Sequence, residues 1–131
     1  MRRVTIAATL VILLSSIAFA ASPAGKYTGT WTGSQSQGNF KIALTPGTAQ
    51  GEWNAQVSFT LGEVEVQCKT AYVKIDGDKV ELAYDFEVSG FTARSTVVGT
   101  IKGSDMEGKY STKASDGSAV DEGTWKVSMV K

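Results

Sequence analysis

The side chains that most often perform chemistry in proteins are scarce in this sequence. It contains no histidine and a single cysteine, Cys68. Histidine is the commonest general base and the commonest metal ligand, so no Ser–His or Cys–His nucleophile pair can form. Zinc ligation by cysteine and histidine is excluded for the same reason. We therefore predict no catalytic residue, no metal site and no cofactor, and we expect a protein that is not an enzyme.

The lone thiol is better explained by packing than by reactivity. Cys68 shares the apolar phase of Val64 and Val66, whereas the neighbouring Lys69 points to the opposite face. A reactive thiol needs a positive neighbour, and a free cysteine otherwise behaves as a small hydrophobic residue. Because no second cysteine is present, we also expect no intramolecular disulfide.

The acidic residues alternate with apolar ones rather than converging. Glu81, Asp85 and Glu87 fall on one face of a single predicted strand, and the turn Asp76-Gly77-Asp78 precedes them. A pair of catalytic carboxylates would have to face one cleft. We interpret the strand acids as a solvated exterior and the turn acids as turn chemistry, since aspartate and glycine both favour tight turns.

The aromatic side chains are the remaining candidates for a functional site. Most of them fall on the apolar phases of their segments, which is typical of a filled core. An aromatic interior that opens at one end is also how barrels hold apolar ligands, and the sequence leaves both possibilities open. The candidate ligand-binding residues are Trp31, Phe40, Trp53, Tyr84, Phe86, Phe91, Tyr110 and Trp125.

These residues lie on segments whose apolar side chains recur at every second position. The clearest run is 79–88, where Val80, Leu82, Tyr84 and Phe86 alternate with mostly charged residues. This period predicts strands rather than helices throughout the chain from Lys26 onward. The candidate strands are 26–33, 38–45, 50–61, 63–70, 72–76 continuing past a turn as 78–88, 90–102, 104–112 and 121–130. We count eight, with an uncertainty of one.

The apolar phase switches once inside a predicted strand. Val64 and Val66 share one phase, whereas Val73 and Ile75 share the other. One extra residue between Thr70 and Tyr72 would explain the change, so we predict a β-bulge or a break between two strands there.

Short strands joined by tight turns predict an all-β fold in which an antiparallel up-and-down meander closes into a barrel. Closure buries the apolar face and removes exposed edges, although a two-sheet sandwich is the alternative. An internal echo favours closure. Gly25-Lys26-Tyr27 recurs as Gly108-Lys109-Tyr110, and Gly29-Thr30-Trp31 recurs as Gly123-Thr124-Trp125. In a closed barrel the first and last strands pair, so similar residues there would face similar surroundings.

The first residues have the three-part pattern of a secretory signal. Arg2 and Arg3 precede an apolar stretch, and a small-x-small motif ends at Ala20. The stretch is shorter than the roughly 20 residues needed to span a membrane. We predict a cleavable signal at 1–20 and one β-barrel domain at 21–131, located in the periplasm or secreted. Without the two arginines, 11 basic residues face 13 acidic ones, so we expect no nucleic-acid partner.

The Gly29-Thr30-Trp31 triplet resembles the Gly-x-Trp signature of the lipocalin and avidin superfamily of barrels. The size and strand rhythm of the chain after Ala20 are similar to those of small secreted bacterial lipocalin-like domains. Two departures are clear in the sequence. No arginine follows Arg94, where lipocalins usually place one on the last strand, and Thr32-Gly33-Ser34 replaces the polar residues with which avidins bind biotin. The resemblance therefore implies a fold rather than a ligand.

Three functions follow as hypotheses. The first is an exported, non-enzymatic protein that holds a small apolar or amphipathic ligand in the barrel. The second is a secreted barrel that engages another protein, as protease inhibitors do by inserting an N-terminal segment, here 21–25. The third is a small outer-membrane barrel, although such barrels need an apolar outer band and the chain ends without the usual terminal aromatic residue. After signal cleavage we do not expect the domain to bind a membrane.

Overall fold

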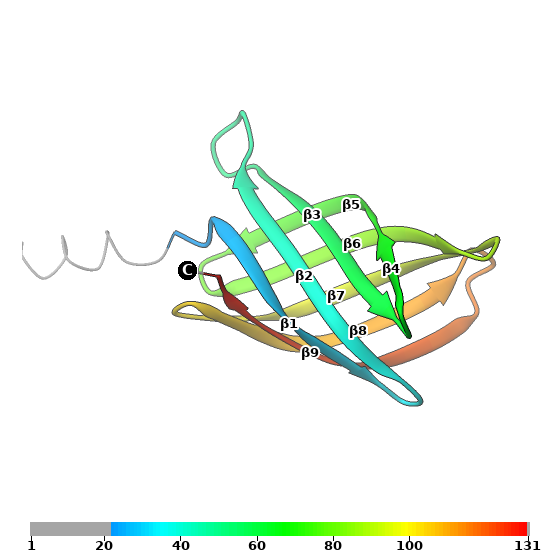
Figure 1. Ribbon diagram of the computed structural model, residues 1–131. Helices are drawn as coiled ribbons and strands as arrows, with labels where there is room; N and C mark the ends of the chain where they lie inside the picture. The colour runs from blue at the N-terminus through cyan, green and yellow to red at the C-terminus, as the bar shows by residue number, and fades with distance from the viewer. Residues whose placement is uncertain (1–21, 131) are drawn as a thin grey trace, which may run out of the picture.

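The computed structural model describes residues 22–130, which form an all-β fold without a helix (Figure 1). All paired strands are antiparallel, and their hydrogen-bonded order is β4-β3-β2-β1-β9-β8-β7-β6-β5. The predicted signal at 1–20 and its cleavage site lie outside the described residues. The strands are β1 (Gly25–Gly33), β2 (Gln37–Pro46), β3 (Trp53–Leu61), β4 (Val64–Gln67), β5 (Lys69–Asp76), β6 (Lys79–Val88), β7 (Phe91–Lys102), β8 (Asp105–Ala114) and β9 (Ala119–Met129).

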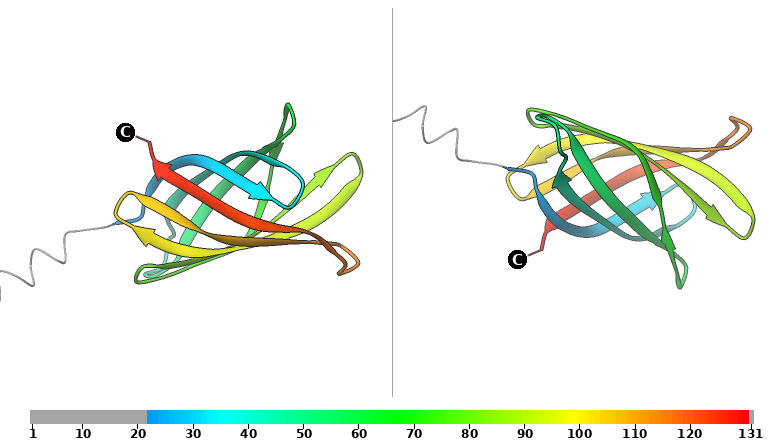
Figure 2. Two further views of the ribbon diagram at one scale, coloured as in Figure 1. Left: turned by 90° about the horizontal axis from the view of Figure 1, so that it is seen from below. Right: turned by 90° about the horizontal axis from the view of Figure 1, so that it is seen from above.

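The meander curls into a nearly closed barrel, as the sequence predicted (Figure 2). The first and last strands, β1 and β9, pair from Tyr27–Met129 to Gly33–Gly123. The remaining seam lies between β3 and β5, where the backbone N–H of Cys68 donates to Val57 O at 3.1 Å. The hydroxyl of Thr70 donates to Ala55 O at 2.7 Å, so two hydrogen bonds hold this seam together.

Nine strands rather than eight arise within the described residues because the segment predicted as 72–76 continuing past a turn as 78–88 forms two paired strands, β5 and β6. The predicted strand 63–70 also divides at a different place than expected. Residues 64–67 pair with β3, whereas residues from Lys69 onward pair with β6. The chain breaks at Cys68, where it passes from one neighbour to the other. The bulge predicted between Thr70 and Tyr72 is confirmed, since the register of β5 against β6 shifts at that point. Gly77, at a φ of +62°, forms the turn that separates β5 from β6.

The alternating apolar residues point into one shared interior. Val80, Leu82 and Tyr84 of β6 are buried, whereas Lys79 on the opposite face is exposed. Burial of each such side chain contributes about 1.5–3 kcal/mol, so the core accounts for most of the favourable free energy of folding. The largest fully buried side chains are Tyr27, Phe40, Leu44, Leu82, Met106, Val97 and Val127.

The repeated Gly-Thr-Trp triplets place two tryptophans side by side inside the barrel. Trp31 of β1 pairs directly with Trp125 of β9. The indole N–H of Trp31 donates to Thr60 O in β3 at 3.1 Å. The indole N–H of Trp125 reaches Lys109 O at 3.1 Å and Val98 O of β7 at 3.2 Å. Each ring therefore crosses its neighbouring strand and is fixed to a backbone carbonyl.

A glycine beside each tryptophan ring makes room for it. Gly38 lies opposite Trp31, and a Cβ atom at Gly38 would come within 2.7 Å of the indole nitrogen. Trp125 lies opposite Gly108 of β8, and its ring reaches Gly99 of β7, where a Cβ atom would come within 2.7 Å of the indole Cζ2. The echo seen in the sequence thus corresponds to two similar arrangements of a tryptophan ring against a glycine, one on each side of the β1–β9 junction.

Candidate functional site

Four turns meet at one end of the barrel and surround its mouth. They join β1 to β2, β3 to β4, β6 to β7 and β8 to β9, and they lie opposite the end that holds the start of β1 and the end of β9 (Figure 1). At the edge of the sheet, β4 is four residues long and pairs only with β3. The mouth is therefore bounded by turns and by a short edge strand.

A cavity of about 370 Å³ opens at this mouth. Its size is near the lower end of the roughly 300–1,000 Å³ typical of small-molecule sites. Side chains from β1, β2, β3, β6, β7, β8 and β9 and from the β1–β2 loop contribute to its wall. The lining residues are Trp31, Ser34, Gln35, Ser36, Phe40, Phe59, Leu61, Tyr84, Phe86, Val88, Phe91, Ser95, Tyr110, Thr112, Val120, Asp121 and Trp125.

The lining changes from buried aromatic rings at the floor to exposed apolar residues at the rim. Phe40 on the floor is 1% exposed, and it stacks edge-on against Trp125 with ring centroids 5.8 Å apart. Phe59 and Phe86 form a second edge-to-face pair at 4.9 Å. At the rim Phe91 is 44% exposed. Edge-to-face pairs stabilise the aromatic wall beyond the contribution of buried area alone. The floor is therefore packed, whereas the rim is open to solvent.

One side of the cavity carries a hydrogen-bonded carboxylate. Asp121 Oδ2 accepts a hydrogen bond of 2.8 Å from the hydroxyl of Tyr110. Asp121 Oδ1 accepts two hydrogen bonds from Ser34, one of 3.1 Å from its backbone N–H and one of 2.9 Å from its hydroxyl. A Cβ atom on Gly33 would lie 2.1 Å from this carboxylate, so the cluster depends on a glycine at that position.

The ionisation of this cluster follows from its contacts. Partial burial alone would raise the pKa of Asp121, but the hydrogen bonds from Tyr110 and Ser34 outweigh it and the pKa lies below its ordinary value. Burial, followed by the bond to Asp121, raises the pKa of Tyr110. Burial likewise raises the pKa of Tyr84. Asp121 is therefore the ionised group of the lining at neutral pH, and both tyrosines keep their protons.

Two buried hydroxyl groups in the lining form a hydrogen bond with each other. Ser95 of β7 and Thr112 of β8 are buried opposite one another, and their hydroxyls share a hydrogen bond. Buried hydroxyls are tolerated when each has a partner. These two side chains are also small, so they leave space next to the aromatic wall.

Seven of the eight predicted ligand-binding residues line this one cavity. Trp53 does not, because it begins β3 opposite Pro46, toward the other end of the barrel. Alternation along a strand tells which face a residue occupies but not which end of the barrel it is near. The residues of the cavity that were not predicted as site residues include Phe59, Asp121 and Val120.

Val120 illustrates why the rim is hard to predict. The register of β8 against β9 shifts between Thr112–Asp121 and Lys113–Ala119, which leaves Val120 unpaired as a bulge. A bulge redirects its side chain, and Val120 turns to the cavity although its phase along β9 is that of the outward residues. Asp121 becomes recognisable as a site residue only once its contacts to Ser34 and Tyr110 are known.

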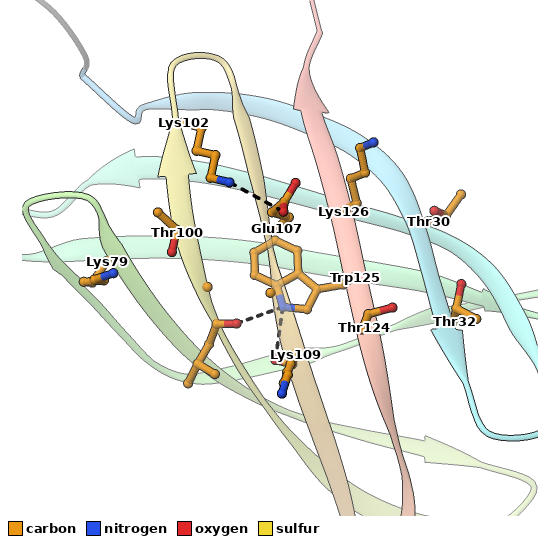
Figure 3. A pocket seen from close by; sticks show the side chains of 13 residues that line it. Thr30, Thr32, Lys79, Thr100, Lys102, Glu107, Lys109, Thr124, Trp125 and Lys126 are labelled. Atoms are coloured by element: carbon orange, nitrogen blue, oxygen red, sulfur yellow. Dashed lines mark hydrogen bonds and ion pairs between the residues drawn. The ribbon is translucent and has the colours of Figure 1, made fainter.

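Two larger hollows lie on the outer surface, and one of them crosses β1, β9, β8 and β7 (Figure 3). Threonines and lysines dominate its lining, and Lys102 forms an ion pair with Glu107 at 3.7 Å. The labelled lysines in Figure 3 point apart rather than toward a common point. This hollow has the character of a solvated sheet exterior.

Cys68, at the seam, is half-buried. Burial raises the pKa of its thiol to about 12, so the thiol stays protonated at neutral pH. Among residues 22–130, no three His, Cys, Asp or Glu side chains gather as a metal site would require. The same part of the chain contains no helix long and apolar enough to cross a membrane.

Comparisons with known proteins return no relative. No family model matches the chain, and no curated protein and no solved structure is significantly similar to it. The nine-stranded, nearly closed antiparallel barrel is compatible with the calycin-like architecture that the Gly29-Thr30-Trp31 triplet suggested.

Proposed function

We propose that this chain is an exported, non-enzymatic binding protein that holds a small apolar or amphipathic molecule in the mouth of a lipocalin-like barrel. The observation that carries the proposal is the cavity of about 370 Å³, which has a buried aromatic floor and opens to solvent at one end. Apolar pockets with a few placed polar groups are the usual form of small-molecule sites. The proposed place of action is the periplasm or the medium outside the cell.

The exposed rim adds a second line of support. Leu61, Phe91 and Val120 line the cavity and all remain substantially exposed. Apolar residues that gather around an opening, rather than lying scattered over a surface, mark places where something apolar docks. A ligand that fills the mouth would cover them.

The alternative functions receive less support from the fold. The segment 22–25, which a protease-inhibitor mechanism would insert into an active site, lies at the end opposite the cavity, and Pro23 O accepts the hydroxyl of Tyr27 at 2.7 Å. An outer-membrane barrel would need an apolar outer band, whereas the outward positions of β1 and β8 carry threonine, lysine and acidic residues.

A fluorescent probe tests the proposal directly. N-phenyl-1-naphthylamine, a neutral apolar dye, is expected to brighten on binding the purified domain and to accept energy from Trp31 and Trp125, which line the cavity. The Trp53→Phe variant should keep this energy transfer, because Trp53 lies outside the cavity.

A matched pair of variants locates the binding. Val120 at the rim and Val98 on the outer face of β7 are 46% and 45% exposed. Val120→Lys should weaken probe binding at least fivefold, whereas Val98→Lys should leave it unchanged. The proposal would be overturned if both variants changed probe binding equally, or if the fluorescence of the dye did not increase in the presence of the wild-type domain.

A further inference from the structure

The charges around the cavity single out one class of amphiphile. The lining contains one carboxylate, that of Asp121, and none of the described residues that form it is a lysine or an arginine. The other two titratable side chains in the lining are Tyr84 and Tyr110, and both stay neutral because their pKa values are raised. The field inside the mouth is therefore that of a single negative charge.

This negative charge lies where the head of a bound amphiphile would sit. Asp121 is the third residue of β9, next to the β8–β9 turn, and it also holds Ser34 in the β1–β2 loop. The buried aromatic residues Phe40 and Trp125 form the floor. A molecule that enters with its apolar tail first would leave its polar head beside Asp121.

Asp121 remains accessible to such a head group. Its oxygens accept three hydrogen bonds, from the hydroxyl of Tyr110 and from the N–H and hydroxyl of Ser34. Asp121 is only partly buried and lines the cavity, so a head group that enters the mouth can still reach its carboxylate. In the partly dry mouth, attraction to a cation and repulsion of an anion are both stronger than in bulk water.

We propose that the cavity selects single-chain amphiphiles with an amine head group and discriminates against the same tail carrying a carboxylate. This inference rests on the function proposed above and specifies the ligand class. A fatty acid would place its carboxylate against Asp121 without a positive side chain in the lining to compensate. An ammonium group would instead form a charge-assisted hydrogen bond with Asp121.

The test compares three probes that share one tail. Dodecylamine, dodecanol and dodecanoate, each below its micelle concentration, displace N-phenyl-1-naphthylamine from the wild-type domain at neutral pH. We expect dodecylamine to bind at least tenfold more tightly than dodecanoate, with dodecanol between them. This panel requires no variant, so it does not depend on any substituted protein folding correctly.

Two variants then assign the preference to one carboxylate. Asp121→Asn should reduce the amine-to-carboxylate affinity ratio at least fivefold. Glu122→Gln removes the same charge from the adjacent, exposed position of β9 and should leave the ratio unchanged. An unchanged ratio in Asp121→Asn, or an equal reduction in both variants, would show that the cavity carboxylate does not select the ligand.

The outcomes separate this inference from the proposal beneath it. If dodecanoate binds as tightly as dodecylamine, the charge selection is refuted while the binding function stands. If none of the three displaces the dye, and the dye itself does not bind, the binding function fails. If amine binding proves to depend only on overall protein charge, Glu122→Gln will reduce it as much as Asp121→Asn, which also refutes the inference.

Discussion

Replacing Gly29 by alanine should destabilise the barrel more than any comparable change at a turn. Gly29 pairs with Val127 across the β1–β9 junction and with Phe40 on the other side. An added Cβ atom would lie 1.8 Å from the carbonyl oxygen of Lys126 and 2.6 Å from the Cα of Val127. Both obstacles are backbone atoms of a strand that is itself paired on its far side with β8, so neither can rotate away.

The size of the destabilisation follows from how far β1 and β9 must move apart to accommodate the added Cβ atom. Separating the Cβ from Lys126 O to an ordinary contact distance demands a shift of more than about 1 Å between β1 and β9. Such a shift breaks about two ladder hydrogen bonds, each worth about 1 kcal/mol, and leaves buried backbone groups unsatisfied at about 1–3 kcal/mol. We expect a loss of about 3–5 kcal/mol in the free energy of unfolding. This corresponds to a fall in Tm of about 12–20 °C for a domain of this size.

Urea denaturation followed by tryptophan fluorescence measures the loss, and Gly103→Ala is the control. Gly103 sits in the β7–β8 turn at a φ of +65°, with no heavy atom within 4 Å of an added Cβ. Gly103→Ala should therefore lower the free energy of unfolding only by the penalty for a non-glycine residue in the left-handed conformation, about 1 kcal/mol. If Gly29→Ala is destabilised no more than Gly103→Ala, the close approach of β1 to β9 that we describe is not present in solution.

Three further predictions concern the core, the thiol and the carboxylate. Phe40→Ala should cost about 3–5 kcal/mol in the free energy of unfolding and Phe91→Ala less than about 1, both measured in urea, because only Phe40 is fully buried. Cys68, with its pKa raised to about 12, should react with iodoacetamide much more slowly in the folded domain than in denaturant at the same pH, as mass spectrometry will show; equal rates would contradict its burial. The pKa of Asp121 is lowered in the folded state, so its contribution to stability is present above its ordinary value of 3.8 and disappears as the pH falls through the lowered value. The urea midpoints of wild type and Asp121→Asn should therefore converge on acidification, and a constant difference from neutral to acidic pH would contradict this.

The sequence predicted the fold well because a sheet with one buried face leaves a period of two in every strand. Val80, Leu82 and Tyr84 are buried together as their spacing required. The pairing of the first and last strands also followed, since Trp31 and Trp125 stand in identical triplets and meet across that junction. The break at Cys68 was not predicted, because a strand that exchanges one neighbour for another keeps its alternation on both sides of the break.

The site was predicted less completely, for a physical reason. Alternation identifies inward residues such as Trp53 and Phe86 equally, although only Phe86 lies at the mouth. The repeat of Gly-Lys-Tyr at 25–27 and 108–110 was a poor guide as well, since the hydroxyl of Tyr27 donates to Pro23 O whereas that of Tyr110 donates to Asp121. Which end of the barrel a residue occupies depends on strand register, and register is decided by pairings between segments far apart in the chain.

The two halves of the interior differ in how completely side chains fill them. Toward the chain ends, large side chains such as Met106 and Leu44 are completely buried and fill the space between the strands. Toward the mouth, inward positions on β7 and β8 carry the small hydroxyl side chains Ser95 and Thr112, which satisfy each other and project little volume. Larger apolar residues at these two positions would fill the cavity and extend the core. The open cavity therefore leaves the folded state less stable than a filled barrel would be. The binding function that we propose would account for this, because binding sites commonly trade stability for activity. Because the same chain packs its other end tightly, the open mouth is a local property of a few residues and not a general failure of the barrel to fill its core.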